Sequence, residues 1–238
     1  MARIIFLHHS TGDNIWRGGT NRYLLRFGLK GDVQRYFDNY NARHDTNLQI
    51  EDRLFPRNDP YGWKNYPFDY YNIWVRHAGP DLYMNEPTLE ILTKEYDVIV
   101  FKHCYPVGRI MRDTGIPDIG SEEKRLENYK LQYNALKKKM HSFPGTKFIL
   151  WTPPAILESK SKPDEALRTQ EFHNWITNVW NENDDNIYIW DFYNYETRGG
   201  LYLKDEYADA PGDNHPGRKF SKEVAPLFSK FVIDTVTS

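Results

Sequence analysis

Hydrophobic residues along the chain occur in two patterns, short continuous runs and longer amphipathic segments. The short runs are rich in β-branched and aromatic residues, as expected for strands that are buried on both faces of a sheet. They predict five strands, at residues 4–7, 48–55, 98–101, 148–151 and 187–190. The runs at 98–101 and 148–151 are almost entirely apolar, so we expect these two strands at the centre of the sheet.

The amphipathic segments predict three helices. The clearest spans about 122–140, where apolar residues recur at alternating steps of three and four, and Ser121 is its expected N-cap. A second helix is expected at 164–180 and a third at 218–236, which Pro226 should break or kink. The residues expected to be buried are Leu126, Tyr129, Tyr133, Leu136 and Met140 in the first helix, Phe172, Trp175, Ile176 and Val179 in the second, and Phe220, Val224, Phe228, Phe231 and Val232 in the third.

Alternation of strands and helices predicts an α/β fold, with a parallel sheet covered by helices on both faces. No repeat, linker or low-complexity tract divides the chain, so residues 1–238 are expected to form one domain. An aromatic-rich insertion lies around 56–95, and its part at 57–87 is too long for an ordinary connection. Long ordered loops often carry function, so this insertion is a candidate binding surface.

Composition excludes several classes of function. The net charge is −2 with Lys and Arg scattered along the chain, so no basic stripe for nucleic acid is expected. No apolar run approaches the ~20 residues of a membrane span. The apolar N-terminus is too short and wrongly flanked for a signal peptide, which favours the cytoplasm if that terminus is native. A single cysteine excludes an intrachain disulfide, and compartment and oligomeric state stay open.

Ligands of open parallel sheets collect at the carboxyl ends of the strands, so the residues that follow each predicted strand are the candidates for chemistry. The first strand leads into His8, His9, Ser10 and Thr11, and later strand ends lead into "PRNDPYGW", "KHCYP", "TPP" and "DFYNYE". The loop "ADAPGDNHPG" precedes the last helix and contains Asp213 and His215, which have no evident packing role. Ser10, His215 and Asp213 are therefore candidates for nucleophile, general base and orienting acid.

Other interpretations of these residues compete with catalysis. Ser10 and Thr11 are also good helix N-caps. His8 and His9 are neighbours on a strand and point to opposite faces, so they cannot easily bind one metal ion, and no metal site or cofactor is expected. Cys104 follows a strand, where a lone cysteine is more often buried than catalytic. Two charged residues lie near these positions in the sequence, Lys102 and Arg109, and both are expected to be solvated.

Four segments together resemble a known family: "IIFLHHSTG", "YDVIVFKHCYP", "LENYKLQYNALKKKMHSFPGTKFILWTPP" and "DNHPGRKF". Their order and spacing are similar to those of SGNH/GDSL-type hydrolases, mostly esterases and lipases, including carbohydrate deacetylases. The resemblance implies a three-layer α/β/α sandwich with a mostly parallel, flavodoxin-like five-stranded sheet. It also implies that Ser10 is the nucleophile, His215 the general base and Asp213 the acid.

The chain departs from the family pattern at three places. His8 and His9 stand where the family has Gly-Asp before the serine, and Asp213 and His215 are two rather than three residues apart. The Gly-x-Asn-Asp segment, whose asparagine donates to the oxyanion, is replaced by "KHCYPVG". We therefore expect the oxyanion to be bound by the backbone N–H groups of Ser10 and Gly62 and by a group at Cys104. The expected substrate contacts are His9, Trp63 and His103.

The sequence as a whole predicts a serine esterase that cleaves an O-acyl, most simply acetyl, ester through an acyl-enzyme. Aromatic residues make up 16% of the chain, and those in the polar segment 56–80 favour a carbohydrate or other small-molecule ester over a lipid. An O-acyltransferase with the same triad is one alternative. A non-catalytic glycan-binding domain on the same fold is the other.

Overall fold

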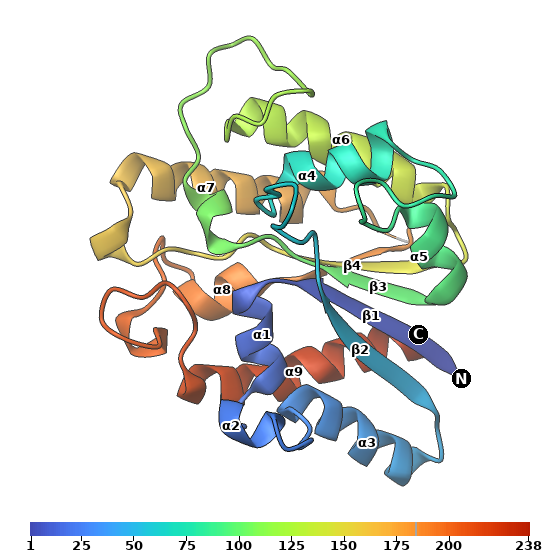
Figure 1. Ribbon diagram of the computed structural model, residues 1–238. Helices are drawn as coiled ribbons and strands as arrows, with labels where there is room; N and C mark the ends of the chain where they lie inside the picture. Colours follow the sequence, from blue (N-terminus) through green and yellow to red (C-terminus); the bar gives the residue numbers. More distant parts are fainter. Residues whose placement is uncertain (184) are drawn as a thin grey trace.

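The computed structural model describes residues 1–183 and 185–238 and contains one five-stranded parallel sheet (Figure 1). The strand order is β2-β1-β3-β4-β5, which is the flavodoxin-like order. All five predicted strands are present, within two residues of their expected ends. Their bounds are Ala2–His8 (β1), Leu48–Leu54 (β2), Val98–Phe101 (β3), Lys147–Trp151 (β4) and Ile187–Trp190 (β5).

Helices cover both faces of the sheet, which confirms the three-layer sandwich (Figure 1). Along β1, Ile4 and Phe6 pack into one core, while Ile5 and Leu7 pack into the other, as the two-residue period of a strand requires. The first core lies under α1, α3 and α9, and the second under α4, α6 and α7. These helices span Ser10–Arg17 (α1), Asp32–His44 (α3), Pro67–Tyr71 (α4), Leu126–His141 (α6), Pro163–Trp175 (α7) and Arg218–Thr237 (α9).

Short helical segments make up much of the remaining structure. In the described parts of the chain, none of the helices is long and apolar enough to cross a bilayer. The further α-helices are Arg22–Leu25 (α2), Leu89–Glu95 (α5) and Phe192–Thr197 (α8); the π-helical turns are Asn72–Arg76 (η1) and Ile176–Trp180 (η4); and the 3₁₀ turns are Tyr105–Gly108 (η2), Glu158–Lys160 (η3) and Asp205–Tyr207 (η5).

Two predicted helices differ from expectation at their ends. Helix α6 begins at Leu126, after Arg125 in extended conformation, so Ser121 is not its N-cap. Helix α7 ends in the π turn η4, which shifts the phase of the buried face because each π turn holds an extra residue. Val179 is consequently 67% exposed and Trp180 is buried in its place.

The prediction for Pro226 was wrong in one respect. Helix α9 continues from Arg218 to Thr237 with Pro226 in its interior, so the proline does not end it. Phe220, Val224 and Phe228 on either side of Pro226 are buried against the sheet. Proline removes one backbone hydrogen bond, and the packing of a whole helical face outweighs that loss.

Several rings of the aromatic insertion belong to the core and not to a binding surface. Tyr70 and Trp74 are fully buried and pack against each other and against Phe101 of β3. The Tyr70 hydroxyl donates to the Lys102 carbonyl at 2.8 Å. The amphipathic character of Tyr and Trp explains why so polar a segment is buried, because their ring tips find partners inside the protein. Only part of this insertion remains available to a ligand.

Candidate active site

Ser10 is presented by the tight connection between β1 and α1. His9 adopts the extended N-cap conformation of α1, no side chain caps this helix, and Ser10 is its first residue. Gly12 permits the connection, because a Cβ at this position would lie 2.4 Å from the Cβ of His8. The Ser10 hydroxyl is therefore not used for N-capping and is free for another partner.

The loop before α9 holds Asp213 and His215 through backbone hydrogen bonds. The Asp209 N–H donates to the His215 carbonyl at 2.9 Å, and the Asp213 N–H donates to the Ala210 carbonyl at 3.0 Å. Asn14 of α1 ties this loop to the serine helix, since its Nδ2 donates to the Pro216 carbonyl at 3.0 Å. The loop and the beginning of α1 are thus anchored to each other.

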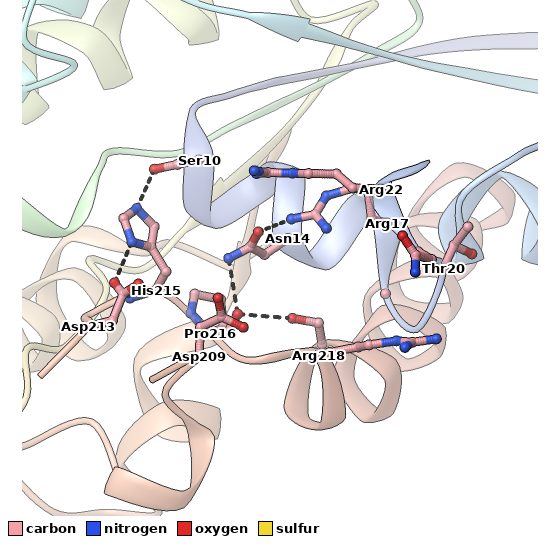
Figure 2. A pocket seen from close by; sticks show the side chains of 13 residues that line it. Ser10, Asn14, Arg17, Thr20, Arg22, Asp209, Asp213, His215, Pro216 and Arg218 are labelled. Atoms are coloured by element: carbon pink, nitrogen blue, oxygen red, sulfur yellow. Dashed lines mark hydrogen bonds and ion pairs between the residues drawn. The ribbon is translucent and has the colours of Figure 1, made fainter. Parts of the chain in front are cut away.

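The structure brings the three predicted catalytic residues into one hydrogen-bonded chain (Figure 2). The Ser10 Oγ lies 2.8 Å from His215 Nε2, and His215 Nδ1 lies 2.6 Å from Asp213 Oδ1. The same carboxylate oxygen accepts the His215 backbone N–H at 3.0 Å. A carboxylate cannot donate, so Nδ1 carries the ring proton and Nε2 is left to accept the proton of Ser10.

Comparison with known proteins identifies the fold. No protein-family model and no curated protein sequence matches the chain. A mutant of an acetyl-xylooligosaccharide esterase from Geobacillus Stearmophilus superposes with a TM-score of 0.57, at 14% identity over 96% of this chain and 93% of that one. An α/β hydrolase enzyme from the metagenome of Lake Arreo, Spain, gives 0.55 at 13% identity over 99% and 95%.

The chain shares the α/β fold of these two hydrolases. At these identities the likeness is one of architecture, and it includes nearly the full length of both proteins. In this fold Ser10 follows β1, and His215 precedes the last helix.

The electrostatic surroundings of Asp213 keep it ionised. Burial raises the pKa of this carboxyl, but the hydrogen bonds from the His215 backbone and ring outweigh burial, and the net pKa lies below its usual range. The ring of Tyr105 stands edge-on to the His215 ring, with centroids 5.2 Å apart. His215 is thus held from two sides, by Asp213 and by Tyr105.

Cys104 lies beside Ser10 but is poorly suited to be a nucleophile. Burial raises the pKa of its thiol, and this outweighs the opposite effects of Lys102 and of a hydrogen bond with Ser10. The thiolate is the reactive form of cysteine, so a thiol with a raised pKa is inert at neutral pH. Cys104 remains a candidate for contact with an oxyanion.

The two histidines before Ser10 have different surroundings. His8 is buried, and its ring nitrogens contact the His9 carbonyl at 2.9 Å and Asp52 at 3.1 Å. His9 lines the cleft beside Ser10, and its Nε2 donates to the Pro56 carbonyl at 2.6 Å. Burial lowers the pKa of His9 to about 4, so its ring is neutral at neutral pH. Contact of His9 with a substrate stays a prediction.

His103 does not reach the cleft, which corrects its expected role in substrate binding. Its side chain is 1% exposed and packs edge-on against Tyr70, with ring centroids 4.7 Å apart. Strand alternation explains this placement, because His103 follows β3 on the face covered by α6, where Tyr133 also contacts it. Neither ring nitrogen has a hydrogen-bond partner within 1–183 and 185–238.

Acid is expected to destabilise the protein through His103. Burial, with the charge of Lys102 second, lowers the pKa of His103 to about 3, whereas the unfolded value is 6.5. The unfolded chain therefore binds more protons between pH 6.5 and 3, and stability falls as the pH falls through this range. We expect the free energy of unfolding in urea to drop by about 2 kcal/mol between pH 7 and 5 because of this residue.

The matched variants are His103→Phe and His44→Phe. His103→Phe should reduce the pH 7-to-5 difference by that amount, while His44→Phe, at an exposed position, should leave it unchanged. An undiminished difference in His103→Phe would contradict the assignment of acid sensitivity to this residue.

Lys102 is the second residue whose position was not expected. It was predicted to be solvated, but it is fully buried on the α1 and α9 side of the sheet, and its Nζ has no hydrogen-bond partner among the described residues. Burial lowers the pKa of Lys102. The nearby Glu196 is also fully buried, and burial raises its pKa to about 8, against the opposing hydrogen bond from the Ala155 N–H. A polar layer therefore lies beneath the strand ends that carry Ser10 and Cys104.

Gly62 lines the cleft with Ser10, but its backbone N–H is already used. It donates to the Asn58 carbonyl, and the φ of +73° explains why glycine occupies the turn. We therefore do not retain Gly62 as an oxyanion donor. Trp63 also lines this cleft, although its side chain is mostly buried.

Two clefts meet at Ser10 and His215. The first, called here the aromatic cleft, has a volume of about 470 Å³ and includes His9, Trp63, Tyr66, Cys104 and Tyr105. The second, called here the arginine cleft, has a volume of about 460 Å³ and includes Asn14, Arg17, Arg22, Asp209 and Arg218. Both volumes are within the usual range for small-molecule sites, ~300–1,000 Å³.

The lining of the arginine cleft was missed by sequence reasoning. Ser10, Asn14 and Arg17 are spaced at steps of four and three, which places them on one face of α1. That spacing becomes a signal only when a helix is expected to begin at Ser10, and no helix was predicted there. Arg218 stands at the beginning of α9, a long way along the chain from the others.

One group of side chains has the geometry to hold a metal ion within the described residues. It consists of His141, Glu182 and Asp185, whose ligand atoms lie within 4.8 Å of one another. Lys137 already contacts Glu182, and His141 Nε2 lies 3.0 Å from Asp185. These residues precede β4 and β5, at the end of the sheet opposite the candidate active site.

Proposed function

We propose that the chain is a serine esterase that hydrolyses an O-acyl ester, most simply an acetyl ester, on a carbohydrate. The observation that carries the proposal is the chain of hydrogen bonds from Ser10 through His215 to Asp213, with distances of 2.8 and 2.6 Å. A serine hydroxyl is a poor nucleophile until an imidazole accepts its proton, and the orientation of His215 suits this role.

In the proposed reaction, Ser10 Oγ attacks the ester carbonyl carbon and its proton moves to His215 Nε2. The carbonyl π electrons move to the oxygen and form a tetrahedral oxyanion. Collapse of this intermediate breaks the bond to the alcohol oxygen, which takes the proton from His215, and leaves an acyl-serine. Water then repeats the sequence on the acyl-serine, releasing the acid and restoring the Ser10 hydroxyl, while Asp213 stabilises the imidazolium in both halves.

The oxyanion would be bound at the N-terminus of α1. The Ser10 N–H is in the first turn of this helix and has no intrahelical acceptor, so it can donate to the oxyanion, and the helix dipole adds to the attraction. Cys104 lies beside the serine hydroxyl and is the second proposed contact. It occupies the segment in which the SGNH pattern has its asparagine.

A carbohydrate substrate is supported by the lining of the clefts. The Tyr66 and Tyr105 rings are half-buried in the aromatic cleft, and the mostly buried Trp63 also lines it. The arginine cleft presents amide, hydroxyl and guanidinium groups that can bind sugar hydroxyls. A structurally similar protein is described as an acetyl-xylooligosaccharide esterase, which fits this substrate class.

The test uses a fluorophosphonate, which forms a covalent bond with activated serines. The wild type is expected to be labelled on the peptide that contains Ser10, and Ser10→Ala is expected to remain unlabelled. In parallel, acetate release from acetylated xylo-oligosaccharides is measured with and without an added sugar acceptor. If acetyl transfer to the acceptor replaces release, the chain is an acyltransferase, and if Ser10 is never labelled, the esterase proposal fails.

A further inference from the structure

We propose that the arginine cleft selects esters whose alcohol part carries a negatively charged group, a carboxylate as in a uronic acid or a phosphate. This inference rests on the proposed esterase function, since it concerns the substrate of the same site. The arginine cleft adjoins the triad directly, because Ser10, Asp213 and His215 form part of its wall.

Three guanidinium groups face this cleft from three separate elements. Arg17 belongs to α1, Arg22 begins α2 and Arg218 begins α9. Figure 2 shows Arg17 and Arg22 close together beside Asn14, with Arg218 on a separate helix. Guanidinium is planar and donates in pairs, so it matches the two oxygens of a carboxylate or phosphate.

These arginines have fewer carboxylate partners than charges. Arg17 and Arg22 share one partner, Asp13, at 3.0 and 3.3 Å. Arg218 donates its Nε to the Gly19 carbonyl at 2.8 Å, and no carboxylate lies within 4.0 Å of it among the described residues. Three guanidinium charges thus have one carboxylate partner, Asp13, and this side of the cleft attracts an anion.

The two carboxylates that line the cleft itself lie on its triad side. Asp213 is ionised and hydrogen-bonded to His215, and Asp209 stands beside Pro216 (Figure 2). Asp32, the first residue of α3, accepts the Gly19 N–H at 2.7 Å and pairs with Arg35. An anionic group is thus repelled from the triad side by Asp209 and attracted to the arginine side.

The orientation of the ester follows from the residues that the two clefts do not share. Cys104, the proposed oxyanion contact, lines only the aromatic cleft, so the carbonyl oxygen of the ester is expected to point there. Asp213 lines only the arginine cleft, and His215 must give its proton to the departing alcohol. The alcohol part therefore extends past Asn14 toward the three arginines.

The experiment compares acetylated methyl glycosides that differ at one carbon. The probes are an O-acetyl glucuronate, its neutral methyl ester, the matching O-acetyl glucoside and the 6-phosphate of that glucoside. For the wild type we expect kcat/KM at least tenfold higher for the carboxylate or phosphate probe than for the neutral ones, with the difference mainly in KM. The two anionic arms show which of the two groups fits better.

The variants Arg218→Gln and Arg22→Gln test the source of this preference. We expect the ratio of anionic to neutral kcat/KM to fall about tenfold in Arg218→Gln and about threefold in Arg22→Gln, because the charge of Arg22 is already partly balanced by Asp13, at 3.3 Å, and Arg218 donates to a neutral carbonyl. Arg43→Gln, at an exposed position on α3, should keep the wild-type ratio. Raising the salt concentration to about 0.5 M should reduce the ratio in the wild type.

A binding measurement separates this inference from the proposed function. Methyl glucuronide without the acetyl group is titrated into the wild type and Arg218→Gln by calorimetry. Binding that is lost in the variant supports the cleft assignment even if no ester is cleaved, which would overturn only the esterase proposal. Equal kcat/KM for anionic and neutral esters, or uronate binding that survives Arg218→Gln, would overturn the inference.

Discussion

Replacing Ser10 by alanine is expected to lower kcat/KM for an acetyl ester by about 10⁴- to 10⁶-fold. The substitution removes the hydroxyl that contacts His215 Nε2, at 2.8 Å, so no acyl-enzyme can form. The measurement is acetate release in steady state, with burst kinetics on an activated ester to detect the acyl-enzyme. Any remaining rate would reflect attack by water at the oxyanion site.

The free energy of unfolding of Ser10→Ala shows whether a loss of activity comes from lost chemistry or from lost folding. The Ser10 side chain does not cap α1, so Ser10→Ala should change the free energy of unfolding by less than about 0.5 kcal/mol. Ser142→Ala, at the end of α6, is the matched control and should retain full activity. Substantial activity in Ser10→Ala would contradict the assignment of Ser10 as the nucleophile. If that activity disappeared when Cys104→Ala was added, the Cys104 thiol would be the nucleophile.

Replacing Asp213 by asparagine is expected to lower kcat by about 10³- to 10⁴-fold. Both hydrogen bonds of His215 go to the same atom, Oδ1, so an asparagine oxygen in that position can accept both but carries no negative charge. The imidazolium that forms when His215 takes the proton of Ser10 then loses its counter-charge. The measurement is kcat at saturating substrate across a range of pH values.

Non-additivity provides a second readout for Asp213. If Asp213 acts only through His215 on Ser10, the double variant of Ser10→Ala and Asp213→Asn should be no less active than Ser10→Ala alone. Asp205→Asn, an exposed residue in the preceding turn η5, is the control and should retain wild-type kcat. A kcat for Asp213→Asn within tenfold of the wild type would show that His215 does not depend on this carboxylate.

The elements of the sheet could be predicted because their signals are local. The runs at β3 and β4 are apolar over every residue or nearly so, and the steps of three and four in α6 identify its buried face within one segment. Errors occurred where the outcome depended on distant packing. Val179 is exposed because of a π turn, and Pro226 lies inside a helix that the sheet stabilises.

The candidate site was predictable in part for a similar reason. Ser10 and His215 stand at a strand end and before a helix, and the order of these segments is readable in the sequence. The buried positions of His103 and Lys102 were not readable, because polar residues after a strand look the same whether a helix covers them or solvent does. The three arginines of the arginine cleft come from parts of the chain that no motif connects.

The sequence by itself determined the alternation of strands and helices, and with it the parallel sheet, because hydrophobic periodicity is set by near neighbours along the chain. The tertiary structure alone decided that Ser10 and His215, 205 residues apart, lie within hydrogen-bond distance. It also decided which aromatic rings fill the core and which line a cleft. Such contacts depend on how helices pack across the sheet, and the free energy of that packing is summed over many residues that are far apart in the chain.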